Sequence, residues 1–200
     1  MGHKARQRGR RNIAGRGIHT SQHPRERAIG PRRIFRQVTF GESESGSRTR
    51  TRLWSNGGSV SGFLLDTNVV SELVKPKPEP RVVTWIQATD ESQLFLSVLT
   101  IGEIRKGISS LPSGNRRALL ESWLGNDLVA RFADRILSID FEIAERWGLL
   151  SAQAKALGVP LPVIDGLLAA TALHHNLTFV TRNTNDVELA GLSVFNPWKN

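Results

Sequence analysis

The chain of 200 residues contains no cysteine. This absence excludes disulfide bonds, a catalytic thiolate and every zinc or iron–sulfur site that depends on cysteine ligands. A cysteine-free chain suits a reducing compartment, and we expect a cytoplasmic protein. No apolar run approaches the ~20 residues that a membrane-spanning helix requires, and the N-terminus lacks the apolar segment of a secretory signal. We therefore expect no membrane partner.

Acidic residues are the scarcer charged type, and the imbalance is confined to one part of the chain. Lys and Arg total 27 against 18 Asp and Glu, which gives a formal net charge of +9. Residues 1–60 carry a net charge of +11, whereas residues 61–200 carry −2. The basic character, which by itself would indicate nucleic-acid binding, therefore belongs to the first 60 residues.

These first 60 residues also have few large apolar side chains. Leu, Ile, Val and Phe make up about 15% of them, and nine of the 18 glycines of the chain lie there. A charged segment with less than roughly 20% of these apolar residues tends to stay disordered. We predict a disordered basic arm over residues 1–60 and one folded domain over residues 61–200. An organelle transit peptide has a similar composition and is an alternative interpretation.

A third interpretation is that the arm is not translated. Val60 directly precedes the first apolar segment, and a GUG start codon is written as valine when translation is assumed to begin upstream. Gly57 and Gly58 are compatible with a purine-rich ribosome-binding site at this point. The true start would then lie near Val60, and the intact mass of the natively expressed protein distinguishes the two cases.

From residue 62 onward, apolar strands alternate with amphipathic helices. We expect strands at 63–65, 94–99, 136–139, 178–181 and 194–195, and helices at 69–74, 82–88, 100–111, 115–132, 141–157 and 162–174. Asn68 and Thr100 are the expected N-caps of two helices, and Gly158 is expected to end the long one. This alternation is typical of an α/β fold with a mainly parallel central sheet flanked by helices.

Oxygen-bearing side chains follow several expected strands. Asp66 ends the first strand, and Glu103 lies in the first turn of the helix after the second. Asp165 lies in the first turn of the helix that begins near Pro162, and Asn183 follows the fourth strand. Ligands of open α/β sheets bind beyond the carboxyl ends of the strands. We therefore expect these side chains to converge on one edge of the sheet.

Each of these residues also has a purely structural interpretation. Thr100 and Glu103 match a capping box, in which the glutamate side chain bonds to the N–H of the cap residue. Asp66 and Asn183 suit turns, and Asp165 favours a helix N-terminus electrostatically. Such an interpretation must nevertheless explain why four elements end in oxygen-bearing side chains at the same edge.

The chemistry expected of such a cluster is metal-dependent. Carboxylates held within a few Å raise each other's pKa unless a cation lies between them. Oxygen ligands without cysteine favour Mg²⁺ or Mn²⁺ over Zn²⁺. A divalent ion bound by Asp66, Glu103 and Asp165 can activate water and stabilise charge on a phosphodiester. The chain has no P-loop and no dinucleotide-binding glycine motif, and an aspartyl-phosphate phosphatase would need a second Asp where Asn68 stands.

A family resemblance is carried by five segments, 63–68 (FLLDTN), 100–107 (TIGEIRKG), 164–172 (IDGLLAATA), 181–183 (TRN) and 194–198 (VFNPW). In order and spacing, these segments resemble the PIN domain of the VapC toxins of bacterial toxin–antitoxin pairs. The last segment is similar to the FitB-like branch. The resemblance covers about residues 62–198 and implies a three-layer PIN-like α/β domain.

The resemblance also implies a function. It points to the toxin of a type II toxin–antitoxin system, an endoribonuclease that depends on Mg²⁺ or Mn²⁺ and hydrolyses RNA phosphodiester bonds. Such a toxin forms a homodimer, is silenced by a cognate VapB/FitA-like antitoxin, and contacts operator DNA only through that antitoxin. Asp66, Glu103 and Asp165 match the three metal-binding and catalytic acids of the family.

The resemblance also places Asn183 in the catalytic group. The sequence departs from the family pattern here, because many members have a fourth Asp at this position and others have Asn. Asp186 can supply the missing charge, so the number of bound metal ions stays open. Asn68 and Thr181 would orient the ligands. Asn183 also leaves an alternative function, a catalytically weak nucleic-acid-binding subunit that acts through an antitoxin–DNA complex.

Overall fold

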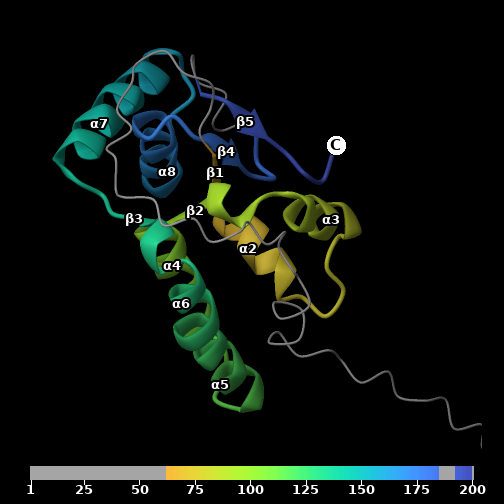
Figure 1. Ribbon diagram of the computed structural model, residues 1–200. Helices are drawn as coiled ribbons and strands as arrows, with labels where there is room; N and C mark the ends of the chain where they lie inside the picture. Colours follow the sequence, from red (N-terminus) through yellow and green to blue (C-terminus); the bar gives the residue numbers. More distant parts are fainter. Residues whose placement is uncertain (1–61, 185–191, 200) are drawn as a thin grey trace, which may run out of the picture.

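The computed structural model describes residues 62–184 and 192–199 (Figure 1). The predicted arm, the start near Val60 and Asp186 lie outside these residues. The strands are β1 (Phe63–Leu65), β2 (Leu94–Ser97), β3 (Ile136–Leu137), β4 (Thr178–Val180) and β5 (Val194–Phe195). The helices are α2 (Thr67–Leu73), α3 (Pro80–Ala88), α4 (Val98–Ser109), α5 (Asn115–Ser122), α6 (Val129–Arg131), α7 (Phe141–Ala156) and α8 (Val163–His174).

The described strands form one sheet in the order β3-β2-β1-β4-β5, and every pair in it is parallel. β1 is the central strand, and it pairs with β2 on one side and with β4 on the other. Parallel neighbours need crossover connections, which the helices provide. The carboxyl ends of β1, β2 and β4 therefore open toward the same edge.

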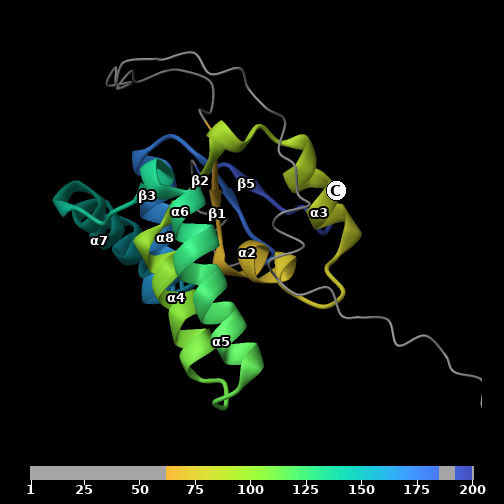
Figure 2. The same cartoon turned by 60° about the horizontal axis from the view of Figure 1, so that its bottom comes forward.

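Helices cover both faces of this sheet. Successive residues of a strand point to opposite faces. Leu65 and Val180 accordingly pack with α2, α3, α4 and the segment after α5, whereas Leu64 and Phe179 pack against α8. α7 packs on the outside of α8. Figure 2 shows α7 and α8 on one side of β1 with α2 and α3 on the other. The predicted three-layer α/β architecture is confirmed.

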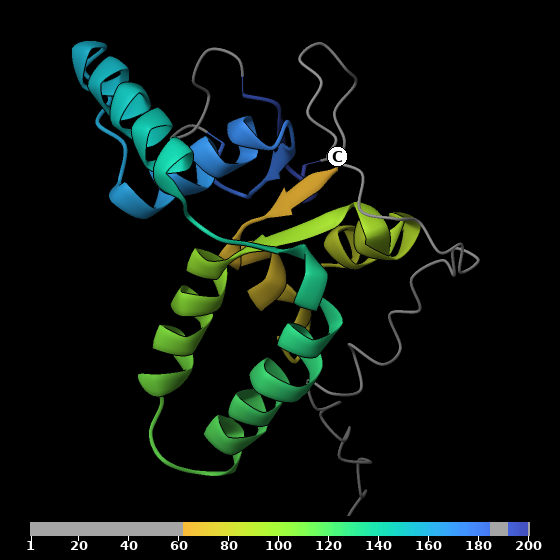
Figure 3. The same cartoon turned by 60° about the vertical axis from the view of Figure 1, so that its left-hand side comes forward.

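α4 and the α5–α6 segment extend together from the sheet as an antiparallel helical pair (Figure 3). The predicted helix over 115–132 is interrupted by a π-helical segment, Trp123–Leu128, between α5 and α6. The predicted end of α7 at Gly158 is confirmed, since this residue adopts a φ of 76° that favours glycine. Within the described ranges, no helix is both long and apolar enough to cross a membrane.

The predicted helix start at Thr100 is wrong. α4 follows β2 without a break, and its N-cap is Ser97, whose Oγ accepts a hydrogen bond from the Leu99 N–H at 3.2 Å. Thr100 is buried inside the helix, where its hydroxyl donates to the Leu65 carbonyl at 3.3 Å. The capping box between Thr100 and Glu103 is therefore excluded, and the glutamate is available for another role.

The predicted cap of α2 is also wrong, by two residues. Asp66 is the N-cap, and its Oδ1 accepts a hydrogen bond from the Thr67 N–H at 2.6 Å. The helix starts directly after the strand, so Asn68 lies in its first turn. The amide of Asn68 is thereby free of a capping role and faces the end of β4 instead.

Candidate active site

Asp66 lies at the centre of the site, at the carboxyl end of the central strand. Its side chain is 8% exposed. Oδ2 accepts a hydrogen bond from the Thr181 hydroxyl at 2.6 Å and another from the Asn68 amide. Together with the cap bond from the Thr67 N–H to Oδ1, these donors fix the carboxylate from two segments of the chain, the start of α2 and the residue after β4.

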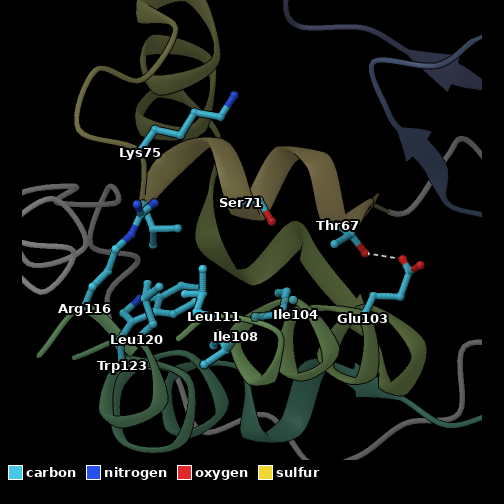
Figure 4. Close-up of a pocket in the computed structure, with 12 residues that line it drawn as sticks. Thr67, Ser71, Lys75, Glu103, Ile104, Ile108, Leu111, Arg116, Leu120 and Trp123 are labelled. Carbon is cyan, nitrogen blue, oxygen red and sulfur yellow. Dashed lines mark hydrogen bonds between the residues drawn. The ribbon is translucent and has the colours of Figure 1, made fainter. Parts of the chain in front are cut away.

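Glu103 reaches the same edge from the first half of α4. Its Oε2 accepts a hydrogen bond from the Thr67 hydroxyl at 2.7 Å (Figure 4). Thr67 therefore contacts both acids, with its N–H bonded to Asp66 and its hydroxyl bonded to Glu103. Sequence reasoning missed Thr67, although its place between Asp66 and Asn68 was a signal that it lies in the site.

Asp165, in the first turn of α8, is the third acid whose charge acts on Asp66. Burial raises the pKa of Asp66 above its ordinary value, and the negative charges of Asp165 and Glu103 raise it further. Hydrogen bonds from Thr181 and Thr67 act in the opposite direction and lower this pKa. The three acids, which come from β1, α4 and α8, thus share one electrostatic neighbourhood at the carboxyl edge of the sheet.

The 181–183 segment closes the site behind Asp66. Thr181 is 1% exposed, and its Oγ1 accepts hydrogen bonds from the Asn183 N–H at 3.1 Å and the Asn68 amide at 3.2 Å. Asn68 also accepts a hydrogen bond from the Arg182 N–H at 3.2 Å. Asn68 and Thr181 therefore lie where ligand-orienting residues are expected, while Asn183 is exposed beside them. The catalytic role of Asn183 stays a prediction.

The donor set suits a hard divalent cation. All three acids offer oxygen, and the burial and raised pKa of Asp66 indicate a site that lacks positive charge. In the described ranges, no Lys or Arg forms an ion pair with Asp66 or Glu103. Among residues 62–184 and 192–199, no three His, Asp or Glu side chains lie close enough together to bind a metal ion by themselves. Water or substrate oxygens would have to complete the shell, as is usual for Mg²⁺.

A groove of about 320 Å³ starts at this edge and runs between α2, α4 and the end of α5 (Figure 4). Thr67 and Glu103 lie at one end, and Lys75 and Arg116 lie at the other. Apolar side chains line the part between them, namely Val74, Ile104, Ile108, Leu111, Leu120 and Trp123. The groove is thus acidic at the site and apolar in the middle. Arg116 provides the positive charge at its far end, because the Lys75 ammonium is paired with Glu72 at 2.6 Å.

Fold and site together define an α/β domain with an acidic centre at the carboxyl edge of a parallel sheet. The family model described as "PIN domain" matches residues 63–192. The chain therefore belongs to the PIN-domain family and, within it, to the VapC/FitB group, as the sequence resemblance predicted.

Its relatives are similar over the folded part. VapC ribonuclease Y4jK of Sinorhizobium fredii is 39% identical over 137 residues, which cover 68% of this chain and 98% of the relative. Toxin FitB of Neisseria gonorrhoeae is 38% identical over 136 residues, which cover 68% of this chain and 98% of the relative. The structure of FitAB bound to an IR36 DNA fragment matches with a TM-score of 0.66 and 37% identity, and covers 68% of this chain and 95% of that chain.

Proposed function

We propose that this protein is the toxin of a type II toxin–antitoxin pair and acts as a Mg²⁺- or Mn²⁺-dependent endoribonuclease. The observation that carries the proposal is the buried Asp66 carboxylate, whose pKa is raised by burial and by the charges of Asp165 and Glu103. A site that concentrates negative charge in this way needs a cation. The name of the relative "VapC ribonuclease Y4jK" supports RNA as the substrate.

In the proposed mechanism Asp66, Glu103 and Asp165 hold the metal ion. When bound, the ion supplies activation of a water nucleophile and stabilisation of charge on the phosphodiester. The hydroxyls of Thr181 and Thr67 donate to the carboxylates of Asp66 and Glu103, respectively, and so keep their remaining lone pairs in fixed directions. By analogy with the family, the products would carry 5′-phosphates.

Metal removal tests this function directly. We expect the purified protein to cleave single-stranded RNA in Mg²⁺ or Mn²⁺, to stop when EDTA is added, and to resume when metal is restored. Sequencing the new RNA 5′ ends after a short induction in cells would identify the substrate. A protein that binds neither ion by calorimetry and cleaves no RNA would contradict the proposal and favour the catalytically weak, nucleic-acid-binding alternative.

The partner belongs to the same proposal. We assign the groove to a segment of a cognate VapB/FitA-like antitoxin, because its apolar middle suits an amphipathic partner and its ends differ in charge. A basic side chain of the partner would face Glu103, and an acidic one would face Arg116. Such a segment would block the acids while bound, and operator DNA would be contacted only through the antitoxin.

Two glycines of α4 offer a matched test of this assignment. Gly107 lines the groove whereas Gly102 does not, and an added Cβ would meet nothing within 4 Å at either position. We expect Gly107→Leu to weaken antitoxin binding roughly tenfold or more, because leucine would fill the groove, and Gly102→Leu to bind like the parent. Leucine is the better helix former, so neither variant should unfold more readily. Equal antitoxin affinities of the two variants would contradict the assignment.

A second copy of the chain is also part of the proposal. Large apolar side chains are exposed on α7, on the loop after it and at the start of α8, namely Phe141, Leu149, Leu157, Val159 and Val163, with exposed fractions of 53–75%. Exposed large apolar residues in this number along two packed helices are typical of protein–protein contact surfaces. We infer a homodimer that uses this surface and acts in the cytoplasm, where its RNA substrates are found.

A further inference from the structure

Arg182 lies directly beyond the acidic site, and its backbone is held on both sides. Its N–H donates to Asn68 Oδ1 at 3.2 Å, and its carbonyl accepts a hydrogen bond from Asn196 Nδ2 at 3.0 Å. Asn68 also donates to the Asp66 carboxylate. The position of Arg182 is therefore set by the same amide that orients the central acid, while its own side chain is exposed.

The guanidinium of Arg182 lies over the ring of Trp198, with its central carbon 5.7 Å from the ring centroid. Trp198 is itself fixed, because its N–H donates to Asn196 Oδ1 at 3.0 Å and its carbonyl accepts a hydrogen bond from Arg81 at 2.7 Å. Asn196 is 6% exposed and bonds to both residues. Arg182 and Trp198 therefore form a preassembled cation–aromatic pair, held together by one buried amide.

The negative charge at the carboxyl edge of the sheet explains how the Arg182–Trp198 pair could serve substrate binding. Asp66, Glu103 and Asp165 concentrate negative charge, and the backbone of a nucleic acid carries one negative charge per phosphate. A bound metal ion neutralises only part of the charge of the acids, so neighbouring phosphates need a cation of the protein. Arginine suits this role, because its planar guanidinium can donate hydrogen bonds to two phosphate oxygens while one of its faces stacks on an aromatic ring.

We propose that Arg182 is a substrate-binding residue that holds an RNA phosphate next to the one cleaved, and that Trp198 is the positioning residue for its guanidinium. The inference rests on the proposed ribonuclease function and adds a residue to it. The ring of Trp198 packs against the core cluster and also contacts the exposed Arg182 guanidinium, so it can hold the cation at a fixed place.

The test compares Arg182→Gln with Lys77→Gln, a variant that loses the same charge at an exposed position of the loop between α2 and α3. For Arg182→Gln we expect the KM for single-stranded RNA to rise about tenfold, with kcat changed by less than about threefold. In the cleavage-deficient Asp66→Asn background, the slope of log Kd against log salt should fall by about one for Arg182→Gln. Trp198→Leu should give a smaller rise in KM, and Trp198→Phe should restore most of the loss.

Lys77→Gln should behave like the parent in both measurements. The inference is overturned if Arg182→Gln leaves KM and the salt slope unchanged, or if Lys77→Gln changes them equally, since only net charge would then matter. A parent protein that cleaves no RNA would contradict the proposed function instead. In that case the Kd and its salt slope, measured on the same proteins, still decide whether Arg182 binds RNA phosphate.

Discussion

Asp66→Asn is expected to lower metal-dependent RNA cleavage about 100-fold or more, because even residues that only support a metal ligand typically contribute 10–100-fold. The substitution keeps the size of the side chain and removes its charge. An amide oxygen can still accept the hydrogen bond of the Thr181 hydroxyl, so the fold should persist. Single-turnover cleavage rates, together with circular dichroism of the two proteins, measure the two effects separately.

Glu103→Gln and Asp165→Asn should cause similar losses, because both acids share the electrostatic neighbourhood of Asp66. Asp134→Asn is the matched control, since Asp134 is an exposed acid in the short turn before β3. Mg²⁺ should raise the thermal midpoint of the parent and the control, but not that of Asp66→Asn. If the three site variants all cleave RNA as fast as the parent, these acids are not the catalytic centre.

Leu64→Ala is expected to cost about 3–5 kcal/mol of the free energy of unfolding. Leu64 is 0% exposed in the middle of the central strand and packs against α8. Its removal leaves a cavity between the sheet and that helix, which also carries Asp165. A loss of this size is a large fraction of the stability of an ordinary domain.

Leu119→Ala is the control for this prediction, because Leu119 is 47% exposed on α5. It should change the free energy of unfolding by less than about 0.5 kcal/mol. Urea unfolding followed by tryptophan fluorescence gives both values. Similar losses in the two variants would mean that the interface between β1 and α8 contributes less to stability than its burial indicates.

The sequence was sufficient to predict the sheet and the edge that holds the acids. Short apolar strands alternate with helices in the sequence. Because parallel strands open toward one edge of a sheet, the acids near the ends of β1 and β2 and at the start of α8 were expected at that edge. Element boundaries were harder to predict. Val98 and Leu99 continue the apolar pattern of β2 and also begin α4, so hydropathy alone cannot show where the strand ends. The displaced cap at Ser97 follows from this.

Contacts between distant segments could not be predicted. The bonds of Asn196 to Arg182 and Trp198 join the end of β4 to the segment after β5, and no local pattern links these segments. The π-helical segment was missed for a related reason. Trp123 and Leu124 are adjacent and both buried, and the extra residue per turn that accommodates them is set by packing rather than by a sequence signal.

The order of the strands has a consequence for synthesis of the protein. Asp66 and Thr181, which bond to each other, are 115 residues apart in the sequence, and Asp165 also comes late. Every residue that lines the proposed antitoxin groove lies between Thr67 and Trp123. A growing chain emerges from the ribosome with its N-terminal part first. Under the proposed function, the residues that bind the antitoxin would therefore emerge before the last residues of the catalytic edge are synthesised.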